Sequence, residues 1–157
     1  MKILFLSGWF PYPPDNGARK RVYYLIKALA KNHDVFLISL LQDDSESEDA
    51  SKLSDICTVV SLHESRWFKP YTIKSLLGLF SSRPRSIVDT YNPSIREAVK
   101  RAVDQIDPDV VVVSTLEVVE YMLNLIDKPS VLIDHNCEFA VLKRNTEYVS
   151  GRISKWR

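Results

Sequence analysis

The chain has 157 residues, which is the size of one ordinary domain. Apolar residues make up 45% of the sequence and charged residues 26%, as in a soluble globular domain, and this composition excludes an intrinsically disordered chain. The formal net charge of +1 lacks the basic excess of a nucleic-acid-binding domain, so we expect no nucleic-acid partner.

The sequence contains two cysteines, Cys57 and Cys137, which are too few and too far apart to form a disulfide framework. We expect both to be reduced and buried, as in intracellular proteins. The N-terminus carries no secretory signal, and no apolar run approaches the roughly 20 residues of a transmembrane helix. These observations predict a cytoplasmic protein.

The first elements predict a βαβ unit. Residues 2–7 form a short apolar run, typical of a strand that is covered on both faces in a parallel sheet. A loop with three prolines and two glycines follows at 8–17, and residues 18–32 have apolar side chains at helical spacing. A second buried strand is expected at 34–41, connected by a right-handed crossover.

The middle of the chain is less regular. Residues 42–50 are acidic and predict a solvated surface loop without the residue spacing of a calcium-binding loop. A third strand is expected at 58–62. Residues 66–82 combine aromatic and aliphatic side chains with flanking lysines and arginines. This pattern indicates either a core or interdomain contact, or a contact with a membrane or lipid acceptor.

The second half predicts a helix at 93–106 with proline at its first position, and then a valine-rich strand at 109–114. A helix at 116–126 and a fifth strand at 130–134 follow. A further helical stretch is expected up to about Val149.

Five strands that mostly alternate with helices predict an α/β fold: a Rossmann-like, doubly wound, mainly parallel sheet in three layers. The last residues, 152–157, look like the start of another helix, so we expect the chain to be a fragment of a longer protein.

In an open parallel α/β sheet, ligands bind at the carboxyl ends of the strands. After the first strand, Gly17 leads into a helix whose free N–H groups suit an anion, and Arg19, Lys20 and Arg21 add positive charge. The loop is either a phosphate cradle or a simple turn before a solvated basic helix face. It contains neither G-x-G-x-x-G nor a P-loop.

Polar groups also follow the fourth strand. Glu117, in the sequence Ser114-Thr-Leu-Glu117, suits the hydroxyls of a sugar. The same residues are equally suited to capping the helix expected next.

The loop after the fifth strand is Asp134-His-Asn-Cys-Glu138. His135 is a candidate to bind a sugar hydroxyl or carry a proton, and Asn136 and Glu138 lie beside it in the sequence. Alternatively, these groups are satisfied by the local backbone. Adjacent residues cannot all converge on one ion, so we expect no metal site.

Five stretches of the sequence together resemble family-4 retaining glycosyltransferases, which have the GT-B fold. These stretches are the Pro-rich loop and basic helix start at 11–21, the helix segment 24–30 ending in Leu-Ala, Arg83-Pro84, Pro108-Asp-Val110 and the loop 134–138. The resemblance covers essentially the whole chain. It implies that residues 1–157 are the N-terminal, acceptor-binding domain, without the C-terminal domain that binds the nucleotide-sugar donor.

The resemblance also implies roles for single residues. Gly17 matches a glycine that lies close to the donor diphosphate, and Arg21 matches a recurrent basic residue at the first helix. His135 matches a histidine near the transferred sugar and is the catalytic candidate, with Glu117, Asn136 and Glu138 as candidates to bind the acceptor. Many relatives have two adjacent glycines in the first loop, whereas Asn16 precedes Gly17 here and Ala18 follows it. Asn16, Gly17 and Arg21 are together the candidates to bind the donor. A positively polarised loop stabilises the leaving diphosphate without a metal ion or cofactor.

The whole protein is therefore expected to transfer a sugar from a nucleotide-sugar to a glycan or lipid-linked acceptor in polysaccharide, lipopolysaccharide or glycolipid synthesis. Peripheral contact with the inner face of a membrane fits that role. The isolated chain, lacking its C-terminal partner domain, is expected to be inactive. The alternatives are a stand-alone nucleotide- or sugar-binding module and another Rossmann-type enzyme, the latter disfavoured by the missing G-x-G-x-x-G.

Overall fold

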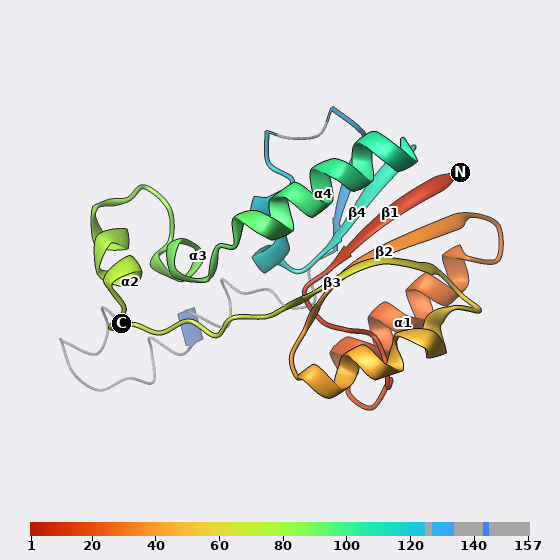
Figure 1. Ribbon diagram of the computed structural model, residues 1–157, viewed down its shortest axis with the longest axis horizontal. Coiled ribbons are helices and arrows are strands. Elements are labelled where there is room, and N and C mark those ends of the chain that lie inside the picture. Colours follow the sequence, from red (N-terminus) through yellow and green to blue (C-terminus); the bar gives the residue numbers. More distant parts are fainter. Residues whose placement is uncertain (125–126, 134–142, 145–157) are drawn as a thin grey trace.

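The computed structural model describes residues 1–124, 127–133 and 143–144. These residues form an α/β fold around a five-stranded, all-parallel sheet with the strand order β3-β2-β1-β4-β5 (Figure 1). The predicted Rossmann-like architecture is confirmed. The strands are β1 (Lys2–Ser7), β2 (Asp34–Leu41), β3 (Thr58–Glu64), β4 (Val110–Ser114) and β5 (Ser130–Ile133).

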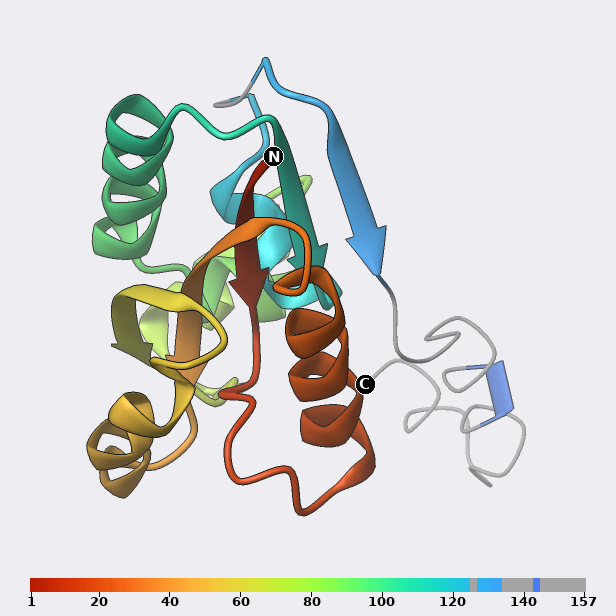
Figure 2. The same cartoon turned by 90° about the vertical axis from the view of Figure 1, so that its right-hand side faces the viewer.

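Helices cover both faces of the sheet, which gives three layers. Figures 1 and 2 show α1 (Gly17–Leu29) and α4 (Pro93–Ile106) on opposite faces. The remaining helical segments are short: the 3₁₀ segments η1 (Asp44–Leu53), η2 (Gly78–Phe80) and η3 (Leu116–Tyr121), and the α-helices α2 (Ile73–Leu77) and α3 (Arg85–Thr90).

The central strand β1 contributes alternate side chains to two apolar cores. Ile3 and Phe5 pack on the α1 side, together with Val22 and Ile26 of that helix. Leu4 and Leu6 point to the α4 side, into a cluster that includes side chains of α4 and η3. Because a strand alternates its side chains between faces, a strand covered on both sides must be apolar throughout. This explains the continuous apolar run that opens the sequence.

Several predicted elements are confirmed closely. The helix predicted at 93–106 is α4, and its first turn is capped by Asn92, whose side-chain oxygen accepts a hydrogen bond from the Ser94 N–H (3.1 Å). All five predicted strands are present, with β3 extending to Glu64 rather than ending at residue 62.

Two predictions along the chain are wrong. The helix predicted at 116–126 is instead the 3₁₀ segment η3, which ends at Tyr121 and is followed by a positive φ of 56° at Asn124. The acidic segment predicted as a solvated loop is the 3₁₀ segment η1; Asp43, Ser47 and Glu48 are exposed as predicted, but Glu46 is buried. In both places tertiary contacts override the local sequence preference.

Residues 66–82 are not part of the core. They lead from β3 through α2 and η2, and their large apolar side chains are exposed. The core interpretation of this segment is therefore wrong.

Cys57 is buried and has a free thiol, as predicted, and burial raises the pKa of that thiol to about 11. Cys137 and the helical stretch expected up to about Val149, apart from residues 143–144, lie outside the described residues. In the part of the chain that the structure describes, none of the helices is long and apolar enough to cross a membrane.

Candidate functional site

The strand order places a topological switch point between β1 and β4. From β1 the chain builds outward through β2 and β3, and it then crosses to the other side of β1 to form β4 and β5. The loops after β1 and β4 therefore leave the same edge of the sheet in opposite directions. Open α/β sheets bind their ligands in the crevice that such a divergence creates.

Gly8 and Thr115 meet at this switch point. The Gly8 N–H donates a hydrogen bond to the Ser114 carbonyl (3.2 Å). A methyl group at Gly8 would lie 2.3 Å from Thr115 Oγ1, which is far inside van der Waals contact, and 3.6 Å from Glu117 Oε2. The missing side chain at Gly8 therefore lets the β4 loop close over the end of β1 and brings the Glu117 carboxylate beside it.

Thr115 has two unfavourable features. Its φ is 87°, a left-handed conformation that a β-branched residue rarely adopts. Its Oγ1 is buried and has no hydrogen-bond partner among the described residues. Each feature costs about 1–3 kcal/mol, and such costs gather at binding sites. A ligand hydroxyl or phosphate at this edge would supply the missing partner.

A cleft of about 750 Å³ opens beside the switch point. Its size falls within the range of ordinary small-molecule sites. Its lining combines aromatic rings with hydrogen-bonding groups, as a carbohydrate with apolar C–H faces and many hydroxyls requires. Its walls include Trp9 after β1, Gln42 after β2, Arg66, Trp67 and Phe68 after β3, and Thr115, Glu117 and Tyr121 after β4.

Tyr121 lies on the α4 side of the sheet and lines the cleft. Its ring stacks on Tyr91, with 5.4 Å between centroids, and its hydroxyl accepts a hydrogen bond from the Asn92 N–H (3.3 Å). Burial raises the pKa of this hydroxyl, so it is present as the neutral phenol.

A hydrogen-bonded chain, the Glu46 network, ties four elements together at the same edge. The Glu46 carboxylate accepts hydrogen bonds from the Arg19 guanidinium of α1 and from the Gln42 N–H (2.8 Å). The Gln42 side chain in turn donates to the Gly8 carbonyl (3.1 Å). The network joins α1, η1 and the ends of β1 and β2, and so fixes the peptide that carries Gly8.

The Arg19 side chain therefore stabilises the fold and is not available to bind a ligand. Its side chain is 14% exposed and pairs with the 6% exposed Glu46, with Asp15 at 3.8 Å as a second carboxylate. Of the three basic residues predicted to form a phosphate cradle, only Lys20 and Arg21 are exposed.

The start of α1 reaches the cleft through Ala18, which lines it. Asn16 is the N-cap residue: its Oδ1 accepts a hydrogen bond from the Arg19 N–H (3.0 Å). Gly17 is exposed, with open space where a side chain would be. Arg21 does not line the cleft.

The predicted site residues are thus only partly brought together. Glu117 lines the cleft, and Asn16 and Gly17 directly precede Ala18 at its wall. His135, Asn136 and Glu138 lie outside the described residues. Within the described ranges, no group of three or more His, Cys, Asp or Glu side chains is placed to hold a metal ion.

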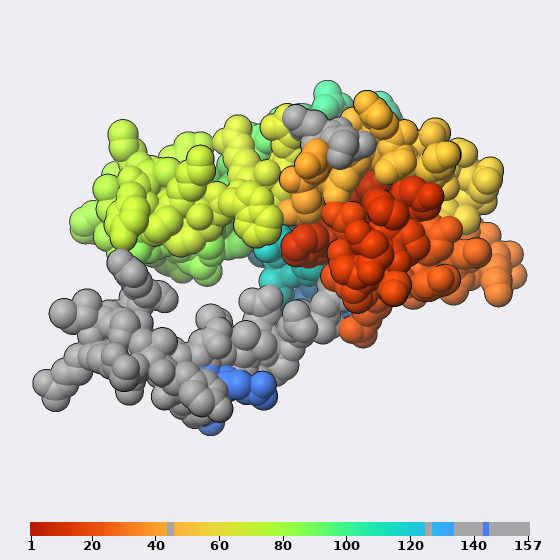
Figure 3. All heavy atoms as spheres, turned by 90° about the horizontal axis from the view of Figure 1, so that it is seen from below, coloured from red at the N-terminus to blue at the C-terminus, as the bar shows by residue number. Residues whose placement is uncertain are grey.

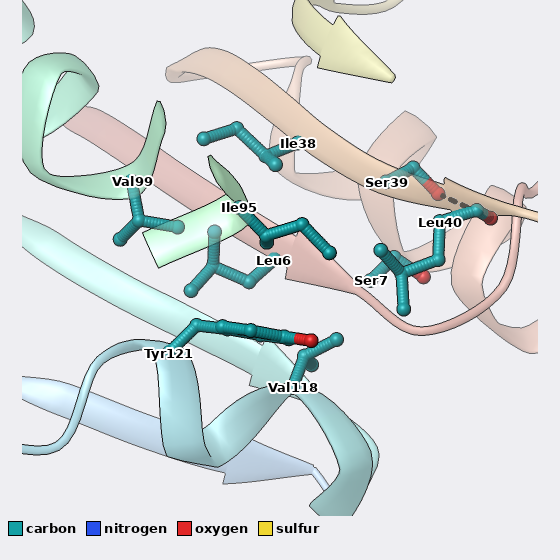
Figure 4. Close-up of a pocket in the computed structure, with 9 residues that line it drawn as sticks. All are labelled: Leu6, Ser7, Ile38, Ser39, Leu40, Ile95, Val99, Val118 and Tyr121. Atoms are coloured by element: carbon teal, nitrogen blue, oxygen red, sulfur yellow. Dashed lines mark hydrogen bonds between the residues drawn. The ribbon is translucent and has the colours of Figure 1, made fainter. Parts of the chain in front are cut away.

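A second cavity lies deeper, between the sheet and α4 (Figure 4). It is lined by apolar side chains such as Leu6, Ile95 and Val99, with Ser7 and Ser39 at one end. Its volume of about 10 Å³ holds at most about one water molecule. Ser7 Oγ donates to the Trp9 carbonyl (2.6 Å), which fixes the turn into the cleft. This cavity is a packing defect of the core and not a ligand site.

Sequence reasoning missed Gly8, Thr115 and Glu46. Gly8 directly follows an apolar strand, which was the available signal that a close backbone approach occurs there. The left-handed conformation of Thr115 and the burial of Glu46 have no signal in the local sequence, because both depend on partners far along the chain.

In sequence comparisons, no protein-family model and no curated protein matched the chain.

The buried ion pair predicts a large effect of removing Glu46. Glu46→Ala leaves the Arg19 guanidinium buried without its main partner, so we expect the free energy of unfolding to fall by about 3–5 kcal/mol. Urea denaturation, monitored by circular dichroism, measures this change in the free energy of unfolding. The matched control is Glu48→Ala, an exposed glutamate of the same segment, with an expected change within about 0.5 kcal/mol. Equal losses in the two variants would contradict the network.

The close contact at the switch point predicts opposite effects at two glycines. Gly8→Ala should lower the free energy of unfolding by about 1–3 kcal/mol because its methyl group meets Thr115 Oγ1. Gly17→Ala, at an open helix position, should be neutral or stabilising by up to about 1 kcal/mol. Thr115→Gly removes the clashing oxygen, so Gly8→Ala should cost far less in that background. An unchanged cost would show that the contact is not what excludes a side chain at Gly8.

Proposed function

We propose that residues 1–157 are the acceptor-side domain of a retaining glycosyltransferase that uses a nucleotide-sugar donor. The observation that carries the proposal is the cleft at the β1–β4 switch point, with Glu117, the ring of Trp9 and a Thr115 Oγ1 that has no partner among the described residues on its walls. The resemblance of the Pro-rich loop and the first helix to family-4 glycosyltransferases supports it from the sequence side.

In this proposal the acceptor lies in the cleft. Its sugar ring stacks on an aromatic side chain such as Trp9, and its hydroxyls donate to the Glu117 carboxylate. The donor diphosphate lies near the N-terminus of α1, where Gly17 leaves room for it and Arg21 contributes charge. In the transfer, the bond between the sugar and the diphosphate breaks, and the acceptor hydroxyl loses its proton as it bonds to the sugar.

The donor site is proposed to need a second domain that faces this edge. His135 remains the catalytic candidate, with Asn136 and Glu138 beside the acceptor. A cytoplasmic location belongs to the same proposal, and the buried thiol of Cys57 is compatible with it.

Calorimetric titration with a panel of nucleotide-sugars tests the proposal on the full-length protein and on this chain side by side. We expect binding by the full-length protein and little or none by the chain alone. Gly17→Ala in the full-length protein should weaken donor binding about tenfold or more without loss of stability, whereas Ala28→Gly, an exposed change on the same helix, should leave donor binding unchanged.

Tight binding of a nucleotide by the chain alone would contradict the proposal. It would favour the alternative, a stand-alone nucleotide-binding module. Donor binding unaffected by Gly17→Ala would remove Gly17 from the donor site.

A further inference from the structure

The segment between β3 and α4 presents an unusual run of exposed apolar side chains. The exposed fractions are 92% for Phe80, 79% for Ile73, 76% for Tyr71 and 68% for Trp67, and Leu76, Leu77 and Leu79 are exposed as well. More than half of the large apolar side chains that are exposed in the described ranges lie between residues 67 and 80. Such a concentration marks an interaction surface.

This segment is a folded lobe rather than a loose loop. We call residues 66–85 the apolar lobe; Figures 1 and 3 show its helical part at one end of the molecule. Arg85 donates hydrogen bonds to the Pro70 carbonyl (2.7 Å) and the Ser75 carbonyl (3.0 Å). Gly78 packs against the Arg85 backbone, where a Cβ would lie 3.3 Å from the Arg85 Cα. The polar contacts of the lobe therefore face inward, and its apolar side chains face solvent.

The charge of the lobe is uniformly positive. No acidic residue lies between Arg66 and Val88 in the sequence, whereas the lobe itself contains Arg66, Lys69, Lys74, Arg83 and Arg85. Arg83 forms an ion pair with Glu120 (2.8 Å), and Arg85 is turned inward, so the outward positive charge is carried mainly by the two lysines. Both lysine side chains are exposed.

The nearest acid after the lobe, Asp89, is already engaged. It accepts hydrogen bonds from the Thr72 hydroxyl and from the Lys69 N–H (2.9 Å). These hydrogen bonds, together with Lys74 and Lys69, lower the pKa of Asp89. The carboxylate thus helps to hold the lobe together and leaves its outer face basic.

We propose that the apolar lobe is a docking surface for an anionic lipid bilayer. Exposed aromatic and aliphatic side chains enter the boundary between headgroups and acyl chains, while lysines at the rim contact anionic headgroups. Each basic residue near such a surface raises partitioning about fivefold.

Charge favours a bilayer over a second copy of the chain. A symmetric pair formed through this face would bring two basic lobes together. A bilayer that contains anionic lipids instead presents negatively charged headgroups directly above an apolar layer of acyl chains.

The lobe is continuous with the cleft, because Arg66, Trp67 and Phe68 line both. This point alone rests on the proposed function: if the cleft binds an acceptor, a lipid-linked acceptor would reach it from the bilayer. Docking itself does not depend on sugar transfer, and its test uses no sugar.

Co-sedimentation with vesicles tests the proposal on the whole chain, at several salt concentrations. We expect binding to vesicles of equal parts phosphatidylcholine and phosphatidylglycerol, weaker binding to phosphatidylcholine alone, and a loss of binding as salt screens the lysines. The double variants Ile73→Ser/Phe80→Ser and Lys69→Gln/Lys74→Gln should each lower partitioning about tenfold or more.

The matched controls change exposed residues on other elements: Tyr24→Ser on α1, and Lys31→Gln/Lys100→Gln beyond α1 and on α4. Their binding should equal that of the unchanged chain, and circular dichroism should show that every variant is folded.

Absence of vesicle binding, or equal binding by lobe and control variants, would overturn the proposal. Vesicle binding by this chain that is absent in the full-length protein would also overturn it, and would assign the lobe to a contact with the second domain.

Discussion

The close approach of Gly8 and Thr115 sets the geometry of the whole carboxyl edge. Parallel pairing of β1 with β4 brings the two loops together, and only a residue without a side chain fits at Gly8. The β4 loop can then cross the end of β1 in a left-handed turn at Thr115 and place Glu117 beside it. The wall of the cleft formed by Thr115 and Glu117, and the Thr115 hydroxyl that has no partner among the described residues, follow from this one contact.

The Glu46 network holds the other side of the same loop. The Glu46 carboxylate of η1 accepts hydrogen bonds from the guanidinium of α1 and from the N–H of Gln42, which directly follows β2. The Gln42 side chain in turn donates to the Gly8 carbonyl. Burying an ion pair costs desolvation energy, and here the Arg19 Nε also has no hydrogen-bond partner among the described residues. This loss of stability is expected at a ligand-binding site, where the loop that carries Gly8 must be held in the correct position before the ligand binds.

The sequence predicted what depends on local periodicity. Continuous apolar runs located the buried strands, and apolar spacing with Pro93 located α4. The sequence failed to predict burial where a residue distant in the chain determines it. Glu46 lies in an acidic run that predicts exposure to solvent, yet its ion pair with Arg19 holds it in the interior. Glu117 and the start of α1 were placed at the correct edge because parallel strands share one carboxyl end. The apolar spacing of residues 67–80 does not distinguish a buried surface from an exposed one.

The central claim is that ligands bind at the β1–β4 switch point, and amide chemical-shift mapping tests it most directly. The chain would be titrated with a panel of acceptor glycans while its backbone N–H signals are followed. The account predicts shifts concentrated at Gly8, Trp9 and Thr115 to Glu117, with none at the opposite edge around Lys2 and Asp109. Shifts at that opposite edge, or none at the switch point with any glycan, would contradict it.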